Sequence, residues 1–112
     1  MSIPMLSPWL WLAGAGLMEV AFTTSLKFMN NDPVGQWPWL VSFVVSAGLS
    51  FACMSQAMAV LPMGTVYAVW TGLGALGTAL VGMMWFGDPV SIARSVFLGL
   101  LVMSVLGLKW LS

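Results

Sequence analysis

Charge, histidine and cysteine are all scarce in this chain. Its 112 residues include three Lys or Arg, three Asp or Glu, one Cys and no His. Charged residues make up 5% of the sequence, against about 25% in a soluble globular domain. Zero formal net charge leaves no basic surface for nucleic acid, and one Cys without His excludes a disulfide framework or a zinc site within one chain. Any side chain that carries protons near neutral pH must therefore be a carboxylate.

Motifs for catalysis are also absent. The sequence has no paired nucleophile and base, no cluster of metal ligands and no phosphate-binding glycine loop. We therefore predict a protein that is not an enzyme and holds no cofactor. The single thiol, Cys53, lies in an apolar run, where a buried and inert side chain is expected.

Apolar residues dominate what is present, at 61% of the chain. No charged residue occurs from Pro33 to Gly87, a stretch more than twice the length of the about 20 residues that one helix needs to cross a bilayer. The chain must turn back within it, and Pro62 and Gly64 mark the break. We predict an all-α membrane protein, a single four-transmembrane-helix bundle over residues 1–112. Its spans are expected at about 9–26, 37–60, 65–86 and 91–111.

Basic residues are nearly balanced between the two sides of the membrane. If the four spans alternate in direction, Lys27 and Arg94 lie on one face and Lys109 on the other. This difference is too small for the positive-inside rule to select an orientation. Either the protein inserts one way for reasons that the sequence does not show, or it inserts both ways.

Glu19 is an acidic residue near the middle of the first span. Such a residue costs roughly 2.5 to 3.5 kcal/mol on insertion scales, and residues of this kind commonly serve function. Its helical neighbours at three and four residues are Ala15, Gly16, Phe22 and Thr23, which leave room for a ligand. We interpret Glu19 as a group that holds a proton at one moment and a cation at the next. The alternative is a protonated Glu19 that only joins helices.

The third span offers a matching surface. Tyr67, Trp70 and Thr71 share a helix face, with Gly74 one turn further on. An indole and a phenol beside a carboxylate make a cation site, although ordinary core packing is equally compatible with this spacing.

The second and fourth spans carry stripes of small residues. Ser50 ends a four-residue repeat of serines that suits helix contacts, or a hydrogen bond to Glu19. In the fourth span, Gly99, Ser104 and Gly107 predict a helix–helix interface used in assembly.

These residues together resemble the small multidrug resistance family. The resemblance rests on LPMGTVYAVWTGLGALG at 61–77, GLMEV at 16–20 and GLK at 107–109, and it covers nearly the whole chain. The YAVWTG segment at 67–72 points to the guanidinium-exporter branch, because the quaternary-ammonium branch usually has Ser in place of Thr71.

The resemblance implies a proton-coupled antiporter of the bacterial cytoplasmic (inner) membrane that exports small cations by alternating access as an antiparallel homodimer. The family's proton and substrate carboxylate falls on Glu19, its second-span serine on Ser50, and its aromatic pair on Tyr67 and Trp70. Phe22 stands where the guanidinium branch usually has tryptophan. This departure removes an indole donor, keeps a ring face, and leaves the identity of the cation open.

The resulting hypothesis is exchange by competition at Glu19. A carboxylate can bind a guanidinium bidentately, whereas an aromatic cage alone favours quaternary ammonium. The expected partners are a small cation, protons, membrane lipid and a second copy of the chain, with no nucleic acid. Three alternatives remain: an exporter of quaternary ammonium or polyaromatic cations, a transporter paired with a sister subunit, and a non-transporting subunit of another membrane protein.

Overall fold

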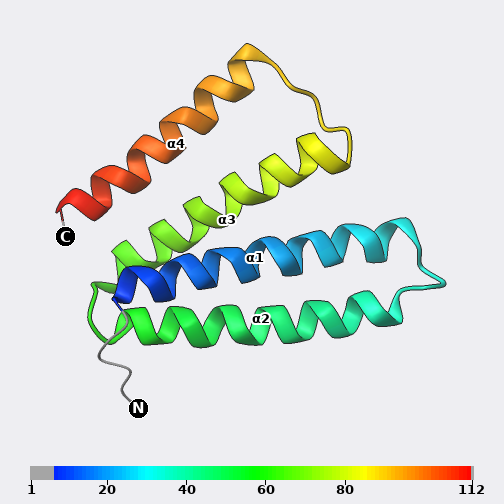
Figure 1. Ribbon diagram of the computed structural model, residues 1–112, viewed down its shortest axis with the longest axis horizontal. Helices are drawn as coiled ribbons and strands as arrows, with labels where there is room; N and C mark the ends of the chain where they lie inside the picture. The colour runs from blue at the N-terminus through cyan, green and yellow to red at the C-terminus, as the bar shows by residue number, and fades with distance from the viewer. Residues whose placement is uncertain (1–6, 112) are drawn as a thin grey trace.

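The computed structural model describes residues 7–111, which form four α-helices and no other regular element (Figure 1). Their bounds are Pro8–Asn31 (α1), Trp37–Met58 (α2), Met63–Trp85 (α3) and Ile92–Leu111 (α4). The all-α prediction is therefore confirmed for this part of the chain.

Three of the helices, α2, α3 and α4, are long and apolar enough to cross a membrane. Helix α1 is not among them, because Glu19, Lys27 and the hydroxyl residues at 23–25 make it more polar than the others. The chain is thus a helical protein with several membrane-spanning segments, and a fourth span in α1 stays a prediction.

The helix ends follow local sequence signals, with one departure from expectation. Helix α1 begins at Pro8 after Ser7, whose hydroxyl accepts a hydrogen bond from the Trp9 amide at 3.2 Å. Helix α1 continues beyond the span expected at about 9–26, through Asn31, and the turn starts at Asp32. Asp32 closes the turn, because its carboxylate accepts a hydrogen bond from the Gly35 amide at 3.1 Å.

Helix α1 lies between α2 and α3 and packs along both (Figure 1). It runs antiparallel to α2 and parallel to α3, while α4 packs mainly against α3. Two contacts between charges and rings occur at opposite ends of the bundle. The Lys109 ammonium lies 5.3 Å from the Trp9 ring centroid, and the Lys27 ammonium lies 6.0 Å from that of Phe86.

The buried core is small and is concentrated near the α2–α3 turn. Its apolar members come from α1, α2 and α3: Leu12, Ala15, Ala57, Val66, Val69 and Trp70. Cys53 is half-buried beside this cluster, less enclosed than predicted. Helix α4 has no buried residue, and large apolar side chains cover the outer faces of the bundle, as lipid contact requires.

Candidate functional site

The Glu19 carboxyl group lies in a close contact between α1 and α3, which we call the α1–α3 seam. It pairs Gly16, Glu19 and Val20 of α1 with Leu73, Gly74 and Gly77 of α3. A methyl group added at Gly74 would overlap both carboxyl oxygens and the carbon that joins them. Other glycines of the two helices make the same close approach, because Gly16 lies against Leu73 and Gly77 against Val20. The backbone of α3 at Gly74 therefore lies so close to Glu19 that any other residue at position 74 would clash with the carboxyl group.

One carboxyl oxygen of Glu19 has an unfilled hydrogen-bonding position. Oε1 is buried and has no hydrogen-bond partner within residues 7–111. An unpaired buried oxygen costs about 1 to 3 kcal/mol, more when it is charged. Either a proton or a cation with N–H donors would satisfy it.

Ser50 connects three helices close to this seam. Its hydroxyl donates to the Ala15 carbonyl oxygen at 2.8 Å and accepts from the Trp70 indole N–H at 2.9 Å. Ala15 precedes Glu19 by one helical turn. The Ser50 hydroxyl is thus directed to the α1 backbone and to Trp70, which agrees with a helix contact rather than with the alternative of a hydrogen bond to Glu19.

The aromatic residues of α3 divide into a buried member and an exposed one. Trp70 is 9% exposed and belongs to the buried core. Tyr67 is 57% exposed, and its ring centroid lies 5.7 Å from that of Trp70. Thr71, on the same helix, is exposed. Trp70 therefore forms an inner wall, while Tyr67 faces outward.

The neighbours of Glu19 on α1 point in different directions. Phe22 turns toward α2, where it meets Phe43 edge to face at a centroid distance of 5.7 Å. Thr23 donates its hydroxyl to the Glu19 carbonyl oxygen at 2.8 Å, and it lines a pocket further along α1. The structure thus brings Glu19, Gly16, Thr23 and Gly74 to the α1–α3 seam and places Phe22 on the α2 side.

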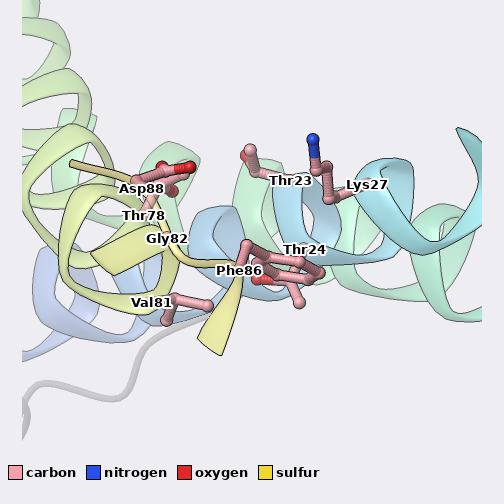
Figure 2. A pocket seen from close by; sticks show the side chains of 8 residues that line it. All are labelled: Thr23, Thr24, Lys27, Thr78, Val81, Gly82, Phe86 and Asp88. Atoms are coloured by element: carbon pink, nitrogen blue, oxygen red, sulfur yellow. The ribbon is translucent and has the colours of Figure 1, made fainter. Parts of the chain in front are cut away.

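That pocket was missed by sequence reasoning. It has a volume of about 150 Å³ and lies between α1, the end of α3 and the following loop (Figure 2). Asp88 lines it although the sequence places this residue in a turn after α3. The detectable signal was a polar residue every fourth position after Glu19, namely Thr23 and Lys27.

The small residues Gly99, Ser104 and Gly107 of α4 make no close contact with another helix among residues 7–111. A methyl group at Gly99 or Gly107 would meet open space, and Ser104 donates its hydroxyl to its own helix at Leu100, at 2.9 Å. The predicted interface residues therefore lie on an exposed face of α4.

The family model of the Small Multidrug Resistance protein matches residues 7–101, which include α1, α2, α3 and about half of α4. The chain belongs to the small multidrug resistance family. Members of this family are membrane transporters rather than enzymes, so the expectation of a non-enzymatic protein is confirmed.

Relatives within the small multidrug resistance family match along almost their whole length. A "Guanidinium exporter" of Yersinia pseudotuberculosis is 41% identical over 90% of this chain and 95% of its own. A "Probable guanidinium efflux system subunit GdnD" of Bacillus licheniformis is 39% identical over 93% of this chain and 98% of its own. An "Uncharacterized membrane protein YvdR" of Bacillus subtilis is 40% identical over 90% and 93%, respectively.

Proposed function

We propose that this protein is a proton-coupled antiporter of the bacterial inner membrane that exports guanidinium or guanidinylated compounds. The observation that carries the proposal is the buried, unpaired Oε1 of Glu19 at the α1–α3 seam. Relatives named as guanidinium exporters and as a guanidinium efflux subunit support the choice of cation.

Charge balance explains why one carboxylate can couple two fluxes. A bare carboxylate inside a bilayer is costly, but a bound proton or a bound guanidinium neutralises it. The protein with a proton or guanidinium bound at Glu19 can therefore switch the side of the membrane to which the site is open. The protein with an unoccupied, charged Glu19 switches rarely. Since proton and guanidinium compete for the same oxygens, movement of one in one direction drives the other in the opposite direction.

The residues around Glu19 have separate roles in this proposal. Ser50 fixes the Trp70 indole through the 2.9 Å hydrogen bond, so the buried ring keeps one wall of the site in place. Tyr67 and Thr71 lie on the exposed side of α3, where a cation approaches. Phe22 contributes a ring but no donor, so we expect Glu19 rather than position 22 to fix the orientation of guanidinium.

Four membrane spans and an antiparallel homodimer complete the proposal. The exposed α4 face with Gly99, Ser104 and Gly107 offers close helix approach to a second copy. The near balance of Lys and Arg between the two sides supports insertion in both orientations. The word "subunit" in the name of the Bacillus licheniformis relative favours a second arrangement, in which this chain pairs with a sister chain of opposite orientation.

Reconstitution into liposomes tests the exchange directly. Glu19→Gln keeps the size of the side chain but can bind neither an exchangeable proton nor a cation by charge, so guanidinium-driven proton flux should fall to the level of empty liposomes. Asp32→Asn is the matched control, because it makes the same acid-to-amide change in an exposed turn and should leave flux intact. Substantial flux through Glu19→Gln would overturn the mechanism.

A panel of substrates and a topology measurement address the remaining choices. Guanidinium and substituted guanidiniums should compete with protons better than tetraalkylammonium ions do, and the reverse preference would indicate the multidrug type of exporter. Labelling of both termini in intact cells should detect two orientations. A single orientation would instead favour the paired system.

A further inference from the structure

Pairs of residues at matching levels of α1 and α3 extend from Glu19 toward the C-terminal ends of both helices. The two helices run parallel, so each step of four residues on α1 keeps pace with four on α3. Glu19 lies against Gly74, and both Thr23 and Thr78, one turn further along, line the pocket. Lys27 and Gly82 follow after another turn, about 12 Å from the level of Glu19 by helix rise.

A second carboxylate, that of Asp88, lies against Gly82 near the C-terminal end of α3. The Asp88 amide donates to the Gly82 carbonyl oxygen at 2.9 Å, and a methyl group at Gly82 would overlap the Asp88 carboxylate. Gly87, with φ of 71°, makes the left-handed turn that brings Asp88 back onto α3. The contact between Asp88 and Gly82 thus repeats, two helical turns along α3, the contact between Glu19 and Gly74. Asp88 is exposed, whereas Glu19 is half-buried.

The pocket between these levels presents hydrogen-bond acceptors and an aromatic face. Figure 2 shows Asp88 and Lys27 on opposite sides of it, with Thr23 between them and Phe86 below. The Thr78 hydroxyl makes no hydrogen bond within the described chain, and no ion pair joins Lys27 to Asp88 there. A cavity of about 150 Å³ accommodates several waters, each of which takes about 30 Å³ in the liquid, and so it also accommodates a small planar cation.

We propose that this pocket is a second, water-facing cation site, at which guanidinium pauses on its way to or from Glu19, with Asp88 as its anionic partner. The inference rests on the proposed exchange function and adds a route to it. Asp88 and the Thr23 and Thr78 hydroxyl oxygens accept from the N–H groups of the cation, and the Phe86 ring faces it.

Lys27 keeps this site weak. Its ammonium group lies near the Phe86 ring and carries the same charge as the substrate, so it opposes prolonged occupancy. A fixed acid concentrates cations at the mouth, whereas the fixed base promotes their departure. Asp88 and Lys27 therefore have opposite effects on the affinity of transport, a signature that damage to the fold would not produce.

Transport kinetics of two charge-removing variants test this signature. Asp88→Asn should raise the KM for guanidinium about tenfold, at the low end of what charge focusing contributes, and should weaken the dependence of KM on ionic strength. Lys27→Gln should lower KM. In both variants the maximal rate should stay within about twofold of wild type, since Glu19 is untouched. Equal KM values, or shifts in the same direction, would overturn the proposal.

A binding measurement separates this site from the exchange mechanism. Guanidinium added to full-length protein with ¹³C-methyl threonine should shift the Thr78 methyl resonance in Glu19→Gln, but not in Glu19→Gln combined with Asp88→Asn. Thermal unfolding of each variant checks that it is folded. Absence of a shift in folded Glu19→Gln would refute the second site. If Glu19→Gln still transports, the exchange mechanism fails, while the methyl titration still decides whether the pocket binds the cation.

Discussion

The α1–α3 seam and helix α4 use glycine in opposite ways. In the seam, a methyl group at Gly74 or Gly77 would collide with a side chain of α1. On α4, a methyl group at Gly99 or Gly107 would meet nothing within 4 Å. The first region is completed within one chain and encloses a carboxylate, whereas the glycines of the second make no close contact within residues 7–111. Glycine in a membrane helix is therefore not enough to identify a close contact between helices, because the structure shows such a contact in the seam and none at these two positions of α4.

The largest effect is expected from Gly74→Ala, which breaks the seam at its closest contact. The added methyl group displaces the Glu19 carboxyl group, so proton-coupled guanidinium flux should be lost, and overpacking should cost about 1 to 3 kcal/mol of stability. Gly99→Ala is the matched control. It should leave the fold of the single chain and the Glu19 contact intact, so any loss of flux should match the loss of self-association in the proposed dimer. Guanidinium flux in liposomes and thermal unfolding are measured for both variants. Equal flux per self-associated protein in Gly74→Ala and Gly99→Ala would contradict the proposed role of the seam.

The next effect concerns hydroxyls that connect helices. Ser50→Ala removes the acceptor of the Trp70 indole N–H and leaves that buried donor unpaired, which should cost about 1 to 3 kcal/mol and slow transport. Ser104→Ala removes a hydroxyl that bonds only its own helix, so the monomer should lose less than about 0.5 kcal/mol. Thermal unfolding in detergent measures both changes. A larger loss for Ser104→Ala would reverse our assignment of the buried side.

The pH dependence of binding sharpens the role of the seam. A proton on Glu19 removes its charge and occupies the oxygen that a cation needs, so guanidinium affinity should fall as pH falls. Where the protonated form dominates, the apparent Kd should rise about tenfold per pH unit. Isothermal titration at a series of pH values tests this, and Asp32→Asn should behave as wild type. A pH-independent Kd would show that proton and cation do not compete.

The smallest effect is expected from Phe22→Trp. Position 22 belongs to α1 but faces Phe43 of α2, away from Gly74, so an added indole donor should alter the preference among substituted guanidiniums only a few-fold. Competition assays on the substrate panel provide the measurement, with Phe43→Trp as a control on the partner ring. A change in substrate class would place this ring in the binding site itself.

Much of the architecture followed from the sequence because the bilayer allows few solutions. The break at Pro62 and the four helical segments were predicted from the length of apolar runs. Helix α1 extends past the expected end of its span at about residue 26, because Asn30 and Asn31 have weak intrinsic preferences that the helix overrides in its last turn. Polarity along α1 also left its membrane span less clear than the other three.

The sequence selects candidate residues for the site but does not predict their contacts. The unusual position of Glu19 and the helical spacing of Tyr67 and Trp70 are properties of one segment at a time. The partner of Ser50 depends on the rotation of α1 relative to α2, which spacing within a helix does not determine. The position of Asp88 over Gly82 depends on a single left-handed residue, Gly87, and no periodic pattern reveals it.

The uneven placement of the buried core has a mechanical consequence. Ser50 and Trp70 fasten α1, α2 and α3 together near the α2–α3 turn, while the opposite end of the α1–α3 seam contains a cavity. If α3 rotates, this fastened end is the point about which it turns. A small rotation of α3 about it would move the outer end of the seam, near Gly82, through a longer arc than Gly74, so access could change widely while the carboxylate contact changes little.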